Sequence, residues 1–201
     1  MEHLKGLAAE TIRRRLAESI ASKQRVLESS CIGVAADVAS ALISSIEGDG
    51  KVVFFGNGGS AMDAGHLAAE LLGRYYIDRP SLPALCLSDF TAAVTAIGND
   101  YSYEDIFARP LRGLGRAGDV AIGLTTSGNS PNVVVALQAA KQLGMIAVAL
   151  TGASGGKVDA VADLCVRVPE TDTPRVQEAC LQIGHSICEV VESYFFAGLD
   201  T

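Results

Sequence analysis

The sequence predicts an α/β fold with a central parallel sheet, preceded by N-terminal helices. Short, continuously apolar runs alternate along the chain with longer stretches of helical periodicity, which is typical of parallel strands buried on both faces. The chain has 201 residues, of which 49% are hydrophobic, and this is enough for one domain with a substantial core. Its 21 glycines are many for a helical bundle and indicate loops shaped by their backbone.

Residues 1–47 are predicted to be helical. Leu7, Ile12 and Leu16 begin an apolar pattern near helical spacing, and a second pattern runs over 32–46. Amphipathic helices ahead of an α/β core often serve in subunit contacts. We therefore expect residues 1–47 to lie in an oligomer interface.

Residues 48–201 are predicted to form the α/β core. Strands are expected over 52–55, 84–87, 119–126, 145–151 and 164–168, and helices over 60–75, 132–143 and 174–196. Pro174 suits the first turn of the last helix, with Asp172 or Thr173 as its N-cap. Because no internal repeat or linker interrupts the chain, we expect residues 1–201 to form a single domain.

The charge balance excludes one class of function. Lys and Arg number 16 and Asp and Glu number 23, a net charge of −7, whereas a general nucleic-acid binder needs a basic face. Charged residues interrupt every apolar stretch before about 18 residues, so we expect neither a transmembrane helix nor a membrane partner.

The cysteines and the N-terminus indicate a cytoplasmic protein. The first residues, Met1 to Lys5, lack the apolar core of a secretory signal. Five cysteines are an odd number without a CxxC pair, which predicts buried, reduced thiols rather than disulfides.

A glycine-rich segment, Gly56 to Ser60, follows the first predicted strand and opens a helix. Backbone amides at such a helix N-terminus bind anions. The segment also satisfies a loose GxGxxA pattern ending at Ala61, so a dinucleotide site with Asp89 as the ribose acid is an alternative. A tight turn without a ligand is another.

A hydroxyl-rich segment, Thr125-Thr126-Ser127-Gly128-Asn129-Ser130, follows a later strand and also precedes a helix. Its hydroxyls and amides predict a phosphate cradle without a lysine. The alternative is a capped turn, because Ser130 followed by Pro131 is a good N-cap pair. Four hydroxyls exceed what capping requires, so we favour a phosphate.

Two helices each offer a pair of metal-ligand side chains. His66 and Glu70 are four residues apart, and Gln177 and His185 are eight apart, so each pair shares a helix face. Imidazole and carboxylate groups suit Zn²⁺. Taken alone, a surface His–Glu contact and a buried core histidine remain open alternatives.

Several motifs occur together and in order over nearly the whole chain, namely 56–61, 63–70, 96–100, 126–131 and 175–178. In these segments the chain resembles the phosphoheptose isomerases of the sugar isomerase (SIS) domain family. The resemblance implies a flavodoxin-like three-layer αβα sandwich with a five-stranded parallel sheet. It also implies a homotetramer whose active sites lie between subunits.

The same resemblance implies the reaction and its residues. D-sedoheptulose 7-phosphate would become D-glycero-D-manno-heptose 7-phosphate, the first step towards nucleotide-activated heptoses. One Zn²⁺ per subunit would be bound by His66, Glu70, Gln177 and His185, while Glu70 and His185 would move the protons through an enediol. The substrate would contact Asn57, Gly58, Gly59, Ser60, Glu70, Asn99, Asp100, Thr125, Thr126, Ser127, Ser130 and Gln177.

Two departures from the family pattern stand out. The family usually has Ser-Thr-Ser where this chain has Thr125-Thr126-Ser127, which retains the hydroxyls. Pro174 occupies a turn in which some members place an acid, so an acidic role there would fall to Asp172 or be absent.

Three rival functions remain open from the sequence. One is an NAD-dependent oxidoreductase, although this explains neither the hydroxyl segment nor the histidines. Another is a non-enzymatic SIS scaffold that binds the bacterial replication initiator, which the chain resembles at 79–84 and 175–178. That scaffold lacks the glutamate and terminal histidine that this chain keeps as Glu70 and His185. The third is an isomerase of another phosphosugar.

Overall fold

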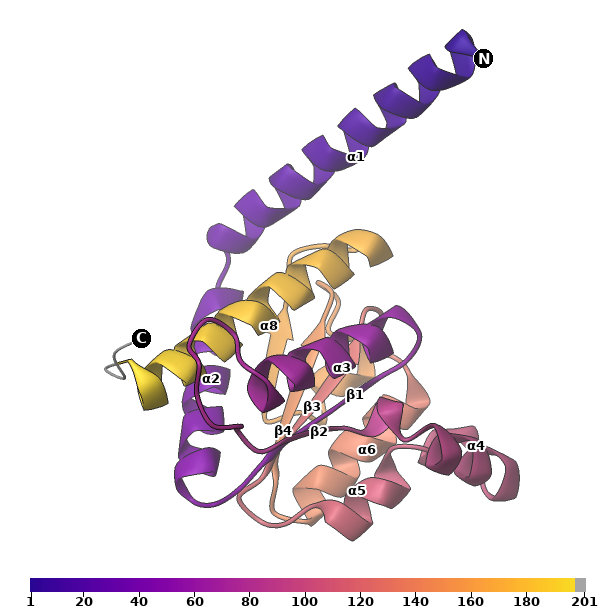
Figure 1. Ribbon diagram of the computed structural model, residues 1–201. Coiled ribbons are helices and arrows are strands. Elements are labelled where there is room, and N and C mark those ends of the chain that lie inside the picture. Colours follow the sequence, from indigo (N-terminus) through magenta and orange to yellow (C-terminus); the bar gives the residue numbers. More distant parts are fainter. Residues whose placement is uncertain (198–201) are drawn as a thin grey trace.

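The computed structural model describes residues 1–197 (Figure 1). They contain a five-stranded, all-parallel sheet in the order β2-β1-β3-β4-β5. This confirms the predicted three-layer fold; the last four residues of the predicted domain lie outside the described part. The strands are β1 Val52–Gly56, β2 Ala84–Cys86, β3 Val120–Thr125, β4 Ile146–Thr151 and β5 Leu164–Arg167.

Helices alternate with these strands. They are α1 Glu2–Leu27, α2 Cys31–Glu47, α3 Gly59–Leu72, α4 Thr91–Asp100, α5 Ala108–Leu114, α6 Pro131–Gln142, α7 Gly156–Asp159 and α8 Thr173–Phe196, with short 3-10 turns η1 Leu87–Asp89 and η2 Tyr103–Asp105. α3 ends at Leu72 rather than at the predicted 75, because Gly73 follows as its C-cap residue. The strand predicted over 84–87 ends at Cys86, where η1 begins.

The strands divide two hydrophobic clusters. Val52 and Phe54 of β1 face a cluster shared with α2, α3 and α8. Val53 and Phe55 face a second cluster, with α5 and α6. The alternation of side chains along one buried strand thus builds both helical layers, which lie on opposite faces of the sheet in Figure 1.

The strand order makes a topological switch point at the carboxyl ends of β1 and β3, the place at which open α/β sheets form a ligand crevice. From β1 the chain crosses to β2 on one side, and it then returns to β3 on the other side of β1. The helices that follow β1 and β3 therefore lie on opposite faces of the sheet, and the loops that open them start at the carboxyl ends of adjacent strands. Ligands of open α/β sheets bind at such a point.

The opposite end of β1 and β3 is held by a buried carboxylate. Asp119 is 1% exposed and accepts hydrogen bonds from the backbone N–H of Lys51 at 2.9 Å and of Arg116 at 2.8 Å. The Lys51 ammonium donates to it at 2.6 Å. These contacts stabilise the fold at the end remote from the crevice.

The long helix α1 projects away from the body of the molecule (Figure 1). Its C-terminal half contacts α8: the Ser19 hydroxyl donates to Glu178 at 2.7 Å, and Arg175 donates to the Arg15 carbonyl at 2.7 Å. Large apolar side chains along α1 remain exposed, namely Leu4, Leu7, Ile12, Leu16, Ile20 and Leu27. The amphipathic pattern of the sequence is therefore left uncovered within one chain.

Among residues 1–197, no single helix is both long and apolar enough to cross a membrane. Only α1 and α2 taken together, bent by 73° where they meet, reach that length and composition.

Candidate functional site

The site is built where α3 and α8 lie side by side. Gly184 of α8 packs so closely on α3 that an added Cβ would stand 2.6 Å from Leu67 Cδ1. Near the start of both helices, a Cβ on Gly59 would stand 2.2 Å from the Gln177 amide nitrogen. A Cβ at Gly184 would force Leu67 to shift, and one at Gly59 would displace the Gln177 amide. The two helices therefore lie in close contact, with their predicted ligand pairs on facing sides.

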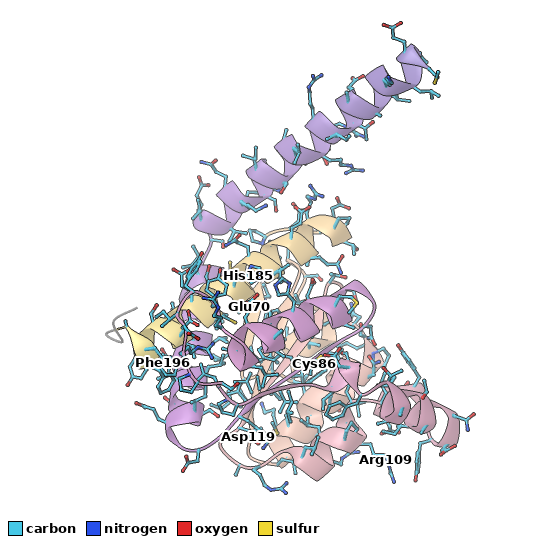
Figure 2. The ribbon with its side chains drawn as sticks, viewed as in Figure 1. Glu70, Cys86, Arg109, Asp119, His185 and Phe196 are labelled. Carbon is cyan, nitrogen blue, oxygen red and sulfur yellow. The ribbon has the colours of Figure 1, made fainter. Side chains whose placement is uncertain are left out.

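Three of the predicted ligands converge between these helices. His66 Nε2 lies 2.9 Å from Glu70 Oε1 and 3.3 Å from His185 Nε2. The two imidazole rings meet edge to face, with centroids 4.9 Å apart. Figure 2 shows Glu70 and His185 close together between α3 and α8. The i,i+4 pair on α3 is thus not a simple surface contact, because a histidine from a distant segment completes it.

The donor atoms fit a zinc ion. One ligand atom from each of His66, Glu70 and His185 lies within 4.8 Å of the others. Two nitrogen ligands at the usual zinc distance on a tetrahedral ion stand about 3.4 Å apart, which matches the 3.3 Å between the two Nε2 atoms. Gln177 is placed against Gly59, and its assignment as a fourth ligand stays a prediction.

Asp63 lies on the same face of α3 and was given no role from the sequence. Its Oδ2 atom is buried and has no hydrogen-bond partner among the described residues. Burial raises the pKa of Asp63, and the nearby His66 and His185 offset part of that rise. Asp63 precedes His66 by three residues and Glu70 by seven, and this spacing places all three on one helix face, a pattern that the sequence alone already shows. A carboxylate without a partner beside two histidines suits a polar or cationic ligand.

Tyr75, in the loop after α3, is a second residue that sequence reasoning missed. Its ring lies 5.8 Å from the ring of His185, centroid to centroid. Burial and the neighbouring Tyr76 raise the pKa of Tyr75 to about 12, so its phenol stays protonated at neutral pH. A tyrosine in a loop carries no periodic signal, so the sequence alone did not identify it.

The glycine segment follows β1 as predicted and forms the N-terminus of α3. Gly58 has a φ of +55°, and a Cβ there would meet no described atom within 4 Å. The space beside the Gly58 backbone is therefore free of other described atoms. Ser60 is buried in the first turn. Seven residues separate Gly59 from His66, which corresponds to about 10 Å along α3. One helix therefore carries both the predicted anion site and the histidine cluster.

The hydroxyl segment follows β3 and opens α6. The Oγ atoms of Thr125 and Ser130 are 2.9 Å apart. Ser130 is the N-cap residue of α6, but its side chain makes no capping bond to the described chain. Ser127 is exposed, and its hydroxyl accepts a bond from the Asn129 backbone. The Ser130 hydroxyl is thus not used to cap α6, which favours the phosphate interpretation over the capped turn.

A pair of asparagines joins the two segments. Asn57 and Asn132 exchange side-chain hydrogen bonds of 2.8 Å in both directions, and Tyr103 donates to Asn57 at 3.2 Å. The expected substrate residues Asn99 and Asp100 lie exposed at the end of α4, bonded to each other at 2.7 Å. In the described chain, Tyr103 rather than this pair contacts the glycine segment.

Comparison with known proteins shows the family of this chain. The SIS domain family matches residues 14–152. The chain is 45% identical to a phosphoheptose isomerase of Sulfurimonas denitrificans over 92% of this chain and 95% of that protein. It belongs to the phosphoheptose isomerase family of SIS domain proteins.

Solved structures agree with this membership. The phosphoheptose isomerase of Neisseria gonorrhoeae has a TM-score of 0.87, with 40% identity over 92% of this chain and 99% of that one. The phosphoheptose isomerase of Francisella tularensis has a TM-score of 0.88, with 34% identity over 92% and 98% of the two chains. The resemblance inferred from the motifs is confirmed, and so is the expectation of an isomerase.

The structure also shows the position of Asp89, the residue that the dinucleotide alternative assigns to the ribose. Asp89, the acid that would have to bind a ribose, lies against α3, where a Cβ on Gly65 would stand 3.1 Å from its Oδ2 atom.

The fold accommodates Pro174, the second departure from the family's sequence pattern, because this residue occupies the first turn of α8. Asp172 lies just outside that turn, with its carboxylate 3.6 Å from Arg15.

The backbone of the hydroxyl segment provides a test of its role. Gly128 has a φ of +68°, and a Cβ there would stand 2.1 Å from the Gly155 carbonyl oxygen. Gly128→Ala must therefore shift the segment, and we expect the KM for the sugar phosphate to rise about tenfold or more, through lost hydrogen bonds. Steady-state kinetics measures this.

Gly113→Ala is the matched control, because a Cβ at Gly113 would meet no described atom within 4 Å. An unchanged KM in Gly128→Ala would contradict phosphate binding by this segment.

Proposed function

We infer that this chain is an aldose–ketose isomerase that converts D-sedoheptulose 7-phosphate to D-glycero-D-manno-heptose 7-phosphate, as the first step towards nucleotide-activated heptoses. Family membership supports this reaction. The observation that carries it is the position of the His66, Glu70 and His185 cluster on helices that also frame the anion-binding loops. Acid–base groups and a phosphate site thus face one substrate.

The phosphate end of the substrate would bind at the crevice between β1 and β3. Ser60, Thr125, Thr126, Ser127 and Ser130 would donate hydroxyl hydrogen bonds, and the N-termini of α3 and α6 would add backbone amides. The sugar hydroxyls would contact Asn57, Gly58, Gly59, Asn99, Asp100 and Gln177. These assignments are supported by the convergence of the two loops on Asn57 and Asn132.

Isomerisation moves a proton between C1 and C2 and requires a base, an acid and stabilisation of charge on two oxygens. We propose that Glu70 takes the proton from one carbon and returns it to the other. Its Oε1 atom lies next to His66, so Oε2 is the oxygen we assign to proton transfer. His185 would move a proton to or from a substrate oxygen on the opposite face, through the ring nitrogen that does not bind the metal. The ring of Tyr75 covers one side of His185 and would limit access of water.

We propose His66, Glu70, Gln177 and His185 as the residues that would hold one Zn²⁺ per subunit. The separation of the two Nε2 atoms and the grouping of ligand atoms from His66, Glu70 and His185 within 4.8 Å of one another support this proposal. When bound, zinc would supply Lewis-acid polarisation of the substrate carbonyl.

Glu70→Gln tests the catalytic assignment. The amide keeps the shape of the side chain but cannot accept the carbon-bound proton, so we expect kcat to fall by about 10²- to 10⁴-fold. Affinity for the sugar phosphate should be largely retained, because the phosphate binds elsewhere. A coupled assay measures turnover, and calorimetry measures binding.

Asp49→Asn, a neutralisation at an exposed position of the turn before β1, is the matched control and should leave kcat unchanged. Near-normal turnover in Glu70→Gln would overturn the assignment, and an inactive wild-type chain would overturn the reaction.

We propose that four copies of this single-domain chain assemble with the active sites between subunits and with residues 1–47 in the interface. The uncovered apolar side chains of α1 support this, as does an apolar groove of about 510 Å³ between α2 and α8. The partial exposure of His66 in one chain also suits a site that a neighbour completes.

Light scattering should therefore give four times the 20.8 kDa of one chain, because isolated exposure of such a stripe is unfavourable. A single-chain mass would contradict the assembly.

We also propose a cytoplasmic location, which the five free thiols support.

A further inference from the structure

A buried ion pair joins the loop after α3 to the end of α8. The guanidinium Nε of Arg79 donates to Glu192 Oε1 at 2.9 Å, and the two side chains are 0% and 2% exposed. The guanidinium also lies 5.6 Å from the centre of the Phe196 ring; Figure 2 labels Phe196 at the end of α8. Burying two charges costs several kcal/mol per ion before pairing, so the pair must be well compensated.

Glu192 is compensated by the backbone of the loop. Its carboxylate accepts hydrogen bonds from the N–H groups of Tyr75 at 2.8 Å, Tyr76 at 2.6 Å and Ile77 at 3.0 Å. Burial acts to raise the pKa of Glu192, but these amides and Arg79 together hold it below its ordinary value. The carboxylate is therefore charged at neutral pH and fixes three consecutive loop residues to α8.

Arg79 is compensated by the end of α3. Its Nη1 donates to the carbonyls of Leu71 at 2.8 Å and Gly73 at 3.2 Å, and its Nη2 donates to the carbonyl of Glu70 at 2.9 Å. Carbonyls in the last turn of a helix lack intrahelical partners, and a cation there also interacts favourably with the helix dipole. Arg79 thus serves as a C-terminal cap for α3.

The hydrogen bonds of Arg79 and those of Glu192 connect the ion pair to the two proposed catalytic residues, Glu70 and His185. On one side Arg79 bonds the backbone of Glu70 itself. On the other side Glu192 holds Tyr75, whose ring packs on His185. Glu192 also follows His185 by seven residues, about two turns, on the same side of α8.

We propose that Arg79 and Glu192 are positioning residues for the isomerase: the pair sets the register of α3 against α8 and orients Glu70 and His185 for proton transfer. This inference rests on the proposed function of those two residues. Neither Arg79 nor Glu192 touches the substrate. The phosphate-binding loops lie at the other end of α3, so the pair acts on proton transfer and not on substrate affinity.

Glu192→Gln tests this role. The amide nitrogen of glutamine is a donor and cannot accept the loop N–H groups, so the loop and Tyr75 must shift. We expect kcat to fall about 10- to 100-fold, as small misplacements of catalytic groups do, while KM stays within about twofold. Kinetics are measured well below the midpoint of thermal unfolding.

Asp119→Asn is the matched control. It also neutralises a buried carboxylate that binds a cation and backbone amides, but at the opposite end of the sheet. It should lower Tm as Glu192→Gln does, yet leave kcat unchanged. If both variants lose stability and both keep wild-type kcat, Glu192 is merely structural and the inference is wrong.

Tyr75→Ala provides a second route if Glu192→Gln does not fold. Tyr75 is only partly buried, so its removal should spare the fold and still lower kcat at near-constant KM. Unchanged kcat in Tyr75→Ala would contradict the claim that Glu192 orients His185 through Tyr75. Wild-type protein and Glu70→Gln are assayed alongside: an inactive wild type would overturn the proposed function, whereas an active wild type with a fully active Glu192→Gln would overturn only the positioning role.

Discussion

Close packing of α3 against α8 is the constraint on which the site depends. Gly184 lies on Leu67, and Gly59 lies beside the amide of Gln177, so that an added Cβ at either position would displace the facing side chain. These glycines let the helices approach until His66, Glu70 and His185 form one cluster. At the far end Arg79 and Glu192 fix the same two helices to each other. Small residues along the contact and a buried ion pair at its end thus make a precise site from two distant segments.

The sheet topology supplies the other half of the site. β1 and β3 are neighbours, and the helices that follow them, α3 and α6, lie on opposite faces of the sheet. The glycine and hydroxyl segments that open these helices therefore meet at the carboxyl ends of the two strands. Asn57 and Asn132 join them. In the proposed function, a chain with a net charge of −7 would bind an anionic sugar phosphate there through local attraction from helix N-termini, loop amides and hydroxyls.

The sequence predicted the fold and three residues that the structure brings together in the candidate site, His66, Glu70 and His185, for identifiable reasons. The five strands and the long core helices follow from uninterrupted apolar runs and from periodicity. The short helices α4 and α5 were not predicted, because 10 and 7 residues carry too few periods, and their apolar residues, such as Ile97 and Leu111, are buried by tertiary packing. Asp63 and Tyr75 were missed for a different reason: their significance depends on α8, which only the folded chain brings close.

Zinc binding is the most direct test of the cluster between α3 and α8. In a chelator competition titration, the wild-type chain should bind one Zn²⁺ per subunit, and His66→Ala or His185→Ala should weaken binding by more than about 100-fold. His3→Ala provides the control, since His3 is the third and last histidine of the chain and lies exposed on α1. Equal zinc affinity in the wild type and in all three variants would contradict a metal centre at this site.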